Sequence, residues 1–317
     1  MSRHVVFGTG QVGRHLISRL AALGHHVVAV NRHGGAVGDA EVITGDATDA
    51  AFTTAVCAGA DSVTFCLNAS TYAGWAKEFP PLQQAVLTGA ANAGARLVVL
   101  DNLYAYGPPR GHRLVETMAA NPTSRKSATR AAMTDALLRA HQQGQVEVAI
   151  GRASDYYGPG ATNTALGENV CDRALTGRTA QVMGDPDQPH SYSYTPDVAA
   201  GLATLATAAG TTGRIWHLPV GETRSTRQLV GDIYRLAGHR PRLMPAGGIT
   251  LRAIGIVKPA MREYLHTLYQ FTRPWVVDDN AFCSTFDVRA TPLDQALTTT
   301  LAWYRDRDRD QAAVPVR

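Results

Sequence analysis

Short apolar runs alternate with longer amphipathic stretches through the first half of the chain. The apolar runs predict strands, and they lie at His4–Phe7, His26–Val30, Val42–Gly45, Ser62–Leu67, Leu97–Asp101 and Val146–Gly151. Apolar residues with helical spacing lie between them, near Val12–Leu23, Asp49–Ala58, Pro81–Ala93 and Ser127–His141. Strands that alternate with helices form βαβ units, in which helices cover both faces of a parallel sheet. The pattern therefore predicts an α/β fold with a doubly wound parallel sheet.

The periodicity becomes weaker after Gly151, where proline and glycine interrupt the chain near residues 157–160 and 184–186. The later elements that the pattern predicts are a strand and two helices, at Arg214–Leu218, Thr226–Leu236 and Leu293–Tyr304. We therefore expect a sheet domain over residues 1–151. Residues 152–317 are expected to form mainly a smaller C-terminal lobe, with some segments that pack back on the sheet domain.

A glycine-spaced segment, Gly8-Thr9-Gly10-Gln11-Val12-Gly13, directly follows the first predicted strand and opens the first predicted helix. In such a turn the first glycine permits a tight bend, and the second lets the backbone approach a pyrophosphate. The third glycine lets the helix pack closely on the strand, and the helix N-terminus faces the phosphates. The alternative is an ordinary glycine-rich turn, since the chain contains 30 Gly. The strand before it and the helix after it favour a dinucleotide site.

The end of the second predicted strand bears on which dinucleotide binds. Asn31 and Arg32 follow Val30, and no acidic residue stands there to accept hydrogen bonds from a ribose 2′-hydroxyl. Arg32 offers a planar, permanently charged group that suits a 2′-phosphate. The alternative is a solvent-facing arginine in a glycine-rich loop. The sequence predicts NADP, with NAD less favoured.

Further cofactor contacts are expected at the ends of the third and fourth predicted strands. Asp46 and Ala47 follow the third strand, where a carboxylate could accept from the adenine amino group. The alternative role for Asp46 is a helix N-cap, which Asp49 could supply instead. Leu67 and Asn68, at the end of the fourth strand, complete the predicted cofactor set.

Composition and charge exclude several classes of function. Lys and Arg number 30 against 26 Asp and Glu, and the basic residues are scattered, so nucleic acid is not expected as a partner. The four cysteines lie far apart without a CxxC pair, which is typical of thiols in a reducing compartment. No signal peptide, membrane-length apolar run, HExxH, GxSxG or phosphate-loop motif is present. We expect a cytoplasmic protein that acts on a small molecule and has no metal site.

Taken together, the motifs resemble the extended short-chain dehydrogenase/reductase superfamily, also called the NAD-dependent epimerase/dehydratase family. The resemblance covers nearly the whole chain and rests on Gly8-x-Gly10-x-x-Gly13, Gly45-Asp46, Tyr106-Gly107, Tyr157-Gly158-Pro159-Gly160 and Asp197-Val198-Ala199. It implies a Rossmann domain, bound NAD or NADP and a small C-terminal substrate lobe. Dimers are common in the family, so a homodimer is compatible with it. The resemblance does not decide among reductases, epimerases, dehydratases and non-redox members.

The chain departs from the family at the usual catalytic Tyr-x-x-x-Lys, a spacing that occurs nowhere in this sequence. The family's offset from Pro122 places Lys126 at the tyrosine position and Arg130 at the lysine position, one helical turn apart. Arg130 could hold the cofactor ribose but cannot exchange a proton near neutral pH. Lys126 could act as an acid only if burial or nearby positive charge lowers its pKa. The alternative is that Lys126 binds a phosphate or a substrate carboxylate.

The segment after the fifth predicted strand offers other catalytic candidates. Asn102 stands where the family often has Ser or Thr, and it could orient a substrate carbonyl without donating a proton in the same way. Tyr104 occupies a position that carries an active-site carboxylate in dehydratases, so it is a candidate for a relocated proton donor. The alternative for Tyr104 is an aromatic wall of the substrate site. Tyr106 is expected to be structural.

Substrate contacts are expected from Tyr156, Tyr157, His190 and Tyr192. His190 stands where sugar-nucleotide members carry a phosphate-binding Arg, and a neutral imidazole binds phosphate less well than guanidinium does. A nucleotide-sugar substrate is therefore disfavoured, and an aromatic-rich lobe suits a carbonyl compound with apolar bulk. Many of these aromatic residues must also pack in the core.

The sequence thus predicts an NADP-dependent oxidoreductase that reduces a small carbonyl compound with an altered proton-donor set. One alternative is an epimerase or dehydratase with tightly bound cofactor. The other is a non-redox NADP-binding sensor, isomerase or cyclase, which the missing Tyr-x-x-x-Lys supports.

Overall fold

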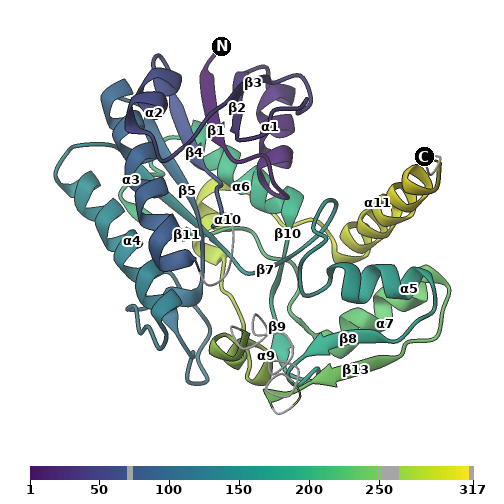
Figure 1. Ribbon diagram of the computed structural model, residues 1–317. Coiled ribbons are helices and arrows are strands. Elements are labelled where there is room, and N and C mark those ends of the chain that lie inside the picture. Colours follow the sequence, from purple (N-terminus) through teal and green to yellow (C-terminus); the bar gives the residue numbers. More distant parts are fainter. Residues whose placement is uncertain (70–73, 249, 251–263, 314–317) are drawn as a thin grey trace.

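The computed structural model describes residues 1–69, 74–248, 250 and 264–313. Seven parallel strands form its central sheet in the order β11-β6-β5-β4-β1-β2-β3 (Figure 1). The bounds of these strands are β1 Arg3–Phe7, β2 His26–Asn31, β3 Glu41–Thr44, β4 Ser62–Phe65, β5 Arg96–Asn102, β6 Val148–Ala153 and β11 Arg214–His217. The order reverses between β1 and β4, and ligands of such sheets bind outside the carboxyl ends of the strands at this switch point. The predicted Rossmann-type parallel sheet is confirmed.

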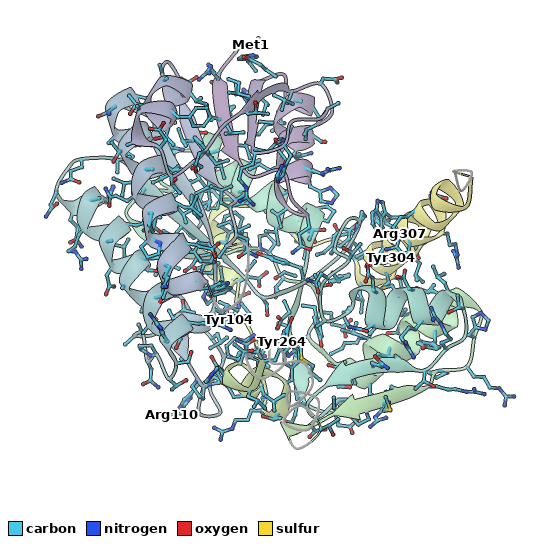
Figure 2. The ribbon with its side chains drawn as sticks, in the orientation of Figure 1. Met1, Tyr104, Arg110, Tyr264, Tyr304 and Arg307 are labelled. Carbon is cyan, nitrogen blue, oxygen red and sulfur yellow. The ribbon has the colours of Figure 1, made fainter. Side chains whose placement is uncertain are left out.

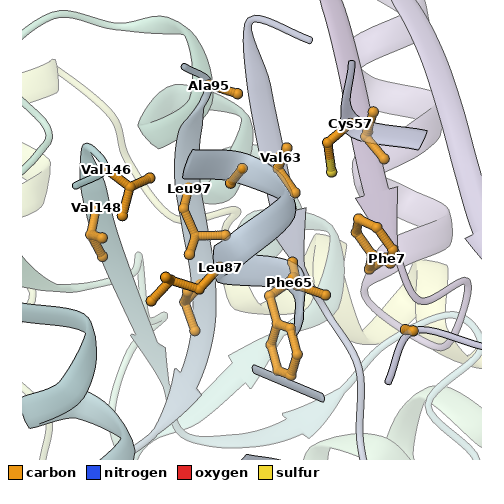
Figure 3. Close-up of a cluster of buried hydrophobic side chains, with 14 of the residues drawn as sticks. Phe7, Cys57, Val63, Phe65, Leu87, Ala95, Leu97, Val146 and Val148 are labelled. Atoms are coloured by element: carbon orange, nitrogen blue, oxygen red, sulfur yellow. The ribbon is translucent and has the colours of Figure 1, made fainter. Parts of the chain in front are cut away.

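Two layers of helices cover the sheet (Figure 1). One layer consists of α1 (Gly13–Ala22), α6 (Thr195–Thr207) and α10 (Asn280–Phe286). The other consists of α2 (Ala50–Cys57), α3 (Trp75–Ala93) and α4 (Arg125–Gln142). Because side chains alternate along a strand, Val5 and Phe7 of β1 pack under the second layer while Val6 packs under the first. Figure 3 shows the second-layer cluster, where Val63 and Phe65 of β4 lie between Leu97 of β5 and Phe7 of β1.

Helix α3 begins earlier than the sequence predicts, at Trp75 rather than at Pro81. Pro80 and Pro81 lie inside the helix, where each lacks the N–H that would bond to the preceding turn. Trp75 and Phe79 are nevertheless buried in the core, at 4% and 0% exposure. Burial of these two aromatic side chains offsets the unfavourable prolines.

The C-terminal half contributes a second, smaller lobe (Figure 1). Its elements are a π-helical turn at Gly167–Asp172, then α5 Arg173–Leu175, β8 Ala180–Met183, α7 Thr226–Ala237, β13 Leu243–Ala246 and α11 Leu293–Ala313. The remaining short elements are η1 Tyr104–Tyr106, β7 Asp155–Tyr157, β9 Pro189–His190, β10 Tyr192–Tyr194, β12 Arg224–Ser225 and α9 Tyr269–Thr272. Strand β11 and helices α6 and α10 come from the same half of the chain but belong to the sheet domain. No helix among the described residues is long and apolar enough to cross a membrane.

Candidate active site

The glycine turn after β1 shows two different uses of glycine. Gly8 has φ +105°, and a Cβ there would lie 2.6 Å from the carbonyl oxygen of Cys66. A Cβ on Gly13 would collide with the carbonyl oxygen of Gly8. By contrast, a Cβ on Gly10 would meet no heavy atom within 4 Å. Gly8 and Gly13 therefore serve packing, whereas Gly10 leaves open space before the N-terminus of α1, the end of a helix that favours anions.

The side chain of Asn31 joins the end of β2 to the glycine turn. Its Nδ2 donates to Thr9 Oγ1 at 3.3 Å, and its Oδ1 accepts from the backbone N–H groups of His33 and Gly34. Arg32 follows with an exposed side chain. Asn31 thus shapes the loop, and Arg32 is left facing the solvent beside the turn.

Asp46 lies beyond the end of β3, close enough to Arg32 for the arginine charge to stabilise its carboxylate. Its Oδ1 accepts hydrogen bonds from the N–H and hydroxyl of Thr48, and these bonds lower the pKa of Asp46. The N-cap of α2 is Asp49, whose Oδ1 accepts from Ala51 N at 2.8 Å. Asp46 is therefore exposed at the sheet edge and does not cap the helix.

The chain after β4 completes this edge of the sheet. Cys66 N donates to Phe7 O at 2.8 Å, which holds the segment beside the glycine turn. Leu67 and Asn68, after β4, are half-buried and exposed, respectively, and Ala47, after β3, is buried. The structure thus places the predicted cofactor residues of the glycine turn and of the ends of β2, β3 and β4 along one edge of the sheet.

Helix α4 carries Lys126 and Arg130, the two basic residues that the resemblance places at the Tyr-x-x-x-Lys positions. Reciprocal hydrogen bonds between Ser124 and Ser127 cap its N-terminus and fix its first turn. Lys126 and Arg130 then lie one turn apart, with exposures of only 6% and 7%. The Arg130 guanidinium carbon sits 4.0 Å above the ring centre of Phe79, a cation–π geometry. This helix therefore presents two long cationic side chains within the protein rather than to solvent.

Asp101, near the end of β5, is a buried carboxylate that lies beside Arg130 and Arg152. Its Oδ1 lies 3.6 Å from Arg130 Nη1, and its Oδ2 accepts from Arg152 Nε at 3.0 Å. Thr134 Oγ1 also donates to Oδ2, at 3.3 Å. Asp101 and Arg152 are 5% and 3% exposed, so the group is removed from water. A single buried carboxylate therefore orients two arginines on different elements.

The segment after β5 is held by the side chain of Asn102, whose Oδ1 accepts from Tyr104 N at 3.0 Å. Tyr104 stacks on Trp75 with ring centres 5.6 Å apart and planes inclined by 16°. Trp75 in turn lies under the Arg130 guanidinium, at 5.0 Å. Figure 2 shows Tyr104 at the lower edge of the sheet domain, while Met1 lies at the upper edge. Tyr104 and Arg130 are thus joined through one indole ring.

Tyr106 is 1% exposed, and its hydroxyl bonds to His217 Nε2 at 2.8 Å. His217 Nδ1 faces the carbonyl oxygen of Asp278 at 2.9 Å, so Nδ1 carries the proton and the tyrosine donates to Nε2. Burial raises the pKa of Tyr106 and lowers that of His217. These bonds give Tyr106 a structural role, as the sequence predicts.

The four residues predicted to contact substrate occupy different surroundings. Tyr156 is half-buried, and the charges of Arg130 and Asp101 act on its hydroxyl, whose pKa burial raises. Tyr157 and Tyr192 are each 4% exposed within the core of the C-terminal lobe. His190 is 2% exposed. Of these four residues, Tyr156 is the one on which the charge of Arg130 acts.

His190 is bonded on both sides of its ring. Its Nε2 lies 2.8 Å from Asp155 Oδ2, and its Nδ1 lies 3.1 Å from the carbonyl oxygen of Gln270. Its ring also stacks on Phe271, with centres 4.8 Å apart. Asp155 was absent from the predicted site, and the only sequence signal for it was its position directly before the Tyr156-Tyr157 pair.

Among the residues that the structure describes, no group of three or more His, Cys, Asp and Glu side chains could hold a metal ion.

Solved structures with the same fold include two dTDP-glucose 4,6-dehydratases. The one from Bacillus anthracis, in complex with NAD, has a TM-score of 0.80 at 14% identity and covers 98% of each chain. The one from Streptomyces venezuelae, a double mutant with NAD and DAU bound, has a TM-score of 0.79 at 20% identity and the same coverage. A UDP-N-acetylglucosamine 4-epimerase from Bacillus cereus has a TM-score of 0.78 at 13% identity and covers 96% of this chain and 100% of its own.

At these identities the likeness shows the shared fold. No curated protein matches the chain significantly. The model of the NAD dependent epimerase/dehydratase family matches residues 5–218, which is more than half of the chain. The resemblance in the sequence is thereby confirmed, and the chain belongs to the NAD dependent epimerase/dehydratase family.

Proposed function

We propose that the chain catalyses an epimerase- or dehydratase-type reaction on a hydroxylated, sugar-like substrate, with a nicotinamide dinucleotide that is regenerated in each cycle. A bound oxidised dinucleotide would supply the reversible hydride transfer that this reaction needs at a hydroxyl-bearing carbon. Family membership favours this reaction over the net carbonyl reduction that the sequence predicts. The names of the structural neighbours point the same way, since they are a dTDP-glucose dehydratase and a UDP-N-acetylglucosamine epimerase.

One observation supports the proposal: Gly10, beside open space, directly follows β1, and the buried Lys126 and Arg130 lie in the first turns of α4, which contacts η1 after β5. Both places follow the carboxyl ends of parallel strands, where ligands of such sheets bind. A dinucleotide seated with its pyrophosphate at Gly10 extends along this edge toward α4. Arg130, held by Asp101, would then present a permanent positive charge to the cofactor ribose. In the family a lysine usually holds the ribose, and a guanidinium can take over this role although it cannot exchange a proton.

The remaining residues would transfer a proton to the substrate, orient it or contact it. Tyr104 would hold or deliver the proton at the substrate oxygen, with Lys126 as the alternative donor. Asn102 has its Oδ1 committed to Tyr104 N, so only its Nδ2 would be available to orient that oxygen. Tyr156 would contact the substrate or the nicotinamide beside Arg130. Together these groups would bind the substrate at the carboxyl edge of β5 and β6.

We further propose NADP as the preferred dinucleotide. Arg32 is exposed at the end of β2, where a 2′-phosphate would lie, and no carboxylate occupies that place. The charge of Arg32 already reaches Asp46, so the same side chain can bridge the phosphate and the adenine side of the site. Ala47, Leu67 and Asn68 would complete the cofactor contacts.

The test follows both cofactor and substrate. Purified chain, loaded with NADP or NAD, is incubated with a panel of nucleotide sugars, free sugars and simple carbonyl compounds. We expect a change in substrate stereochemistry or loss of water, detected by NMR and mass spectrometry, with no net change in NADPH absorbance. Stoichiometric consumption of NADPH would instead indicate a reductase. Tight binding of NADPH with no reaction across the panel would indicate a non-redox protein.

A further inference from the structure

His15 joins two segments that lie far apart in the sequence. It lies on α1, two residues after the last glycine of the glycine turn, and it is half-buried. Its Nε2 lies 2.9 Å from the carbonyl oxygen of Pro159, a residue 144 positions further along the chain. A carbonyl oxygen only accepts, so Nε2 carries a proton and donates it. This bond connects the helix that opens the dinucleotide site to the turn that follows β7.

The other hydrogen bonds of the glycine turn and α1 stay within the first half of the chain. Arg14 Nε donates to the carbonyl oxygen of Thr9, and Thr9 Oγ1 accepts from Asn31. Among the residues that the structure describes, His15 alone in 8–22 forms a hydrogen bond to a residue beyond 151. Helix α1 also packs on α6 through apolar side chains, but such contacts are not directional. The bond of His15 therefore adds a directional link between the two halves.

The turn at Pro159 is fixed from two other sides. Gly158 has φ +131°, and a Cβ there would lie 2.5 Å from Thr195 Oγ1, so the turn packs tightly on the start of α6. The same hydroxyl lies 3.5 Å from the Pro159 carbonyl oxygen, a longer contact than that of His15. The carbonyl oxygen of Ala161 accepts from the hydroxyl of Tyr304 at 2.9 Å, and Tyr304 lies on α11 in the C-terminal lobe (Figure 2). Residues 158–161 thus connect α1, α6 and the lobe.

This turn continues from the edge of the sheet where a substrate would lie. Pro159 follows Tyr156 by three residues, and Tyr156 lies just beyond the carboxyl end of β6. Ala153, the last residue of β6, is in register with Asn102, the last residue of β5. Ligands of such sheets bind beyond these strand ends. His15 therefore links the glycine turn, at one end of the candidate site, to β7 at the other.

We propose that His15 is a positioning residue that sets the distance between the two ends of the dinucleotide site, with the pyrophosphate at Gly10 and the nicotinamide beside β7. The inference rests on the proposed function, because it requires a dinucleotide at the glycine turn. A ligand that spans two elements binds more tightly when their separation is already set, since less freedom is lost on binding. His15 should therefore affect the binding of a whole dinucleotide, but not that of a ligand that occupies only the end at the glycine turn.

The experiment compares a whole dinucleotide with its fragment. In His15→Leu the donor to Pro159 is lost, whereas His15→Gln keeps an N–H donor on a side chain of similar length. The matched control is Tyr304→Phe, which removes a bond of equal length from the same turn on the side of the lobe. Each chain is titrated calorimetrically with NADPH and with adenosine 2′-phosphate 5′-diphosphate, which lacks the nicotinamide riboside. Thermal unfolding shows that each variant is folded.

We expect the NADPH affinity of His15→Leu to fall about tenfold while its affinity for the fragment stays the same. His15→Gln should recover most of the loss, and Tyr304→Phe should bind both ligands as the wild type does. Equal losses for both ligands, no loss, no recovery in His15→Gln, or the same selective loss in Tyr304→Phe overturns the proposal. If the wild type binds neither ligand, the dinucleotide site of the proposed function fails, and the role of His15 fails with it. If the selective loss occurs but no substrate reacts, the proposed reaction fails while the role of His15 stands.

Discussion

Asp101 and Arg152 form a buried ion pair beneath the site, with Arg152 Nε 3.0 Å from Asp101 Oδ2. The same carboxylate lies 3.6 Å from Arg130 Nη1, so two buried guanidinium groups depend on it. Removal of one partner of a buried pair leaves an uncompensated charge. We expect Asp101→Asn to lower the free energy of unfolding by about 3–5 kcal/mol, as measured by urea denaturation.

The control for this prediction is Asp187→Asn, which breaks the exposed pair between Asp187 and Arg227. Because exposed ion pairs contribute little, the unfolding free energy of this variant should hardly change. Equal stability of the Asp101 and Asp187 variants would show that Asp101 does not hold the two arginines.

Substitutions in the glycine turn should affect stability at one position and dinucleotide affinity at another. Gly10→Ala adds a methyl group where no protein atom lies within 4 Å, so the thermal unfolding midpoint should stay the same. Because that space is where the pyrophosphate would lie, dinucleotide affinity should fall at least tenfold. In Gly13→Ala the methyl group collides with the backbone of Gly8, which should cost about 1–3 kcal/mol or more of stability.

Gly231→Ala is the matched control, because its added Cβ also meets nothing within 4 Å but lies in α7, in the other lobe. It should leave dinucleotide affinity unchanged and stabilise the helix by up to about 1 kcal/mol. Fluorescence titration with NADPH and differential scanning calorimetry measure the two quantities. Undiminished affinity in Gly10→Ala would place the dinucleotide elsewhere.

The sheet could be predicted from sequence because its strands are buried on both faces. Val5, Val6 and Phe7 are all fully buried, so the strand is read as a continuous apolar run between turn residues. Helix α3 was predicted to begin too late because local proline preferences point to a helix start, whereas packing of Trp75 and Phe79 places the start earlier. Tertiary contacts decide such boundaries, and they are not local in sequence.

The candidate site could be predicted only where residues are close in sequence. Lys126 and Arg130 are one helical turn apart, so their common location follows from spacing alone. The pairing of Asp155 with His190 spans 35 residues. Nothing local in the sequence indicates that both ring nitrogens of His190 are occupied by Asp155 and by the carbonyl oxygen of Gln270.

Arg32 should determine which dinucleotide binds. In Arg32→Ala the charged group that would meet the 2′-phosphate is lost, so NADPH affinity should fall about tenfold or more, equivalent to at least about 1.4 kcal/mol. NADH affinity should change little, because NADH lacks that phosphate. Arg19→Ala serves as control, since Arg19 is exposed in the last turn of α1, away from the glycine turn. Parallel losses of NADPH and NADH affinity would contradict a 2′-phosphate contact.

His4 should make stability depend on pH. It is 1% exposed at the start of β1, and burial together with the neighbouring His25 lowers its pKa from 6.5 to about 4. Between pH 6.5 and about 4, His4 therefore binds a proton in the unfolded chain but not in the folded protein. The contribution is fully present above pH 6.5 and is lost as the pH falls toward 4, which amounts to about 3 kcal/mol.

Urea denaturation of the wild type and of His4→Gln between pH 7.5 and about 4.5 measures this effect. The wild type should lose stability more steeply than His4→Gln as the pH falls. His26→Gln removes an exposed histidine from the same part of the sheet and should retain the wild-type slope. Equal slopes for the wild type and His4→Gln would exclude His4 as the source.

Variants of Tyr104 and Lys126 should show which of the two side chains transfers the proton. Tyr104→Phe removes the hydroxyl but keeps the ring that stacks on Trp75, so the site should keep its shape. With the substrate that the panel identifies, we expect kcat to fall by about 10²–10⁴ at unchanged dinucleotide affinity, because loss of a positioned acid removes that much rate. Lys126→Met should instead act mainly on KM. A large fall of kcat in Lys126→Met with near-normal turnover in Tyr104→Phe would assign the proton to the lysine, and two unchanged kcat values would assign it to neither.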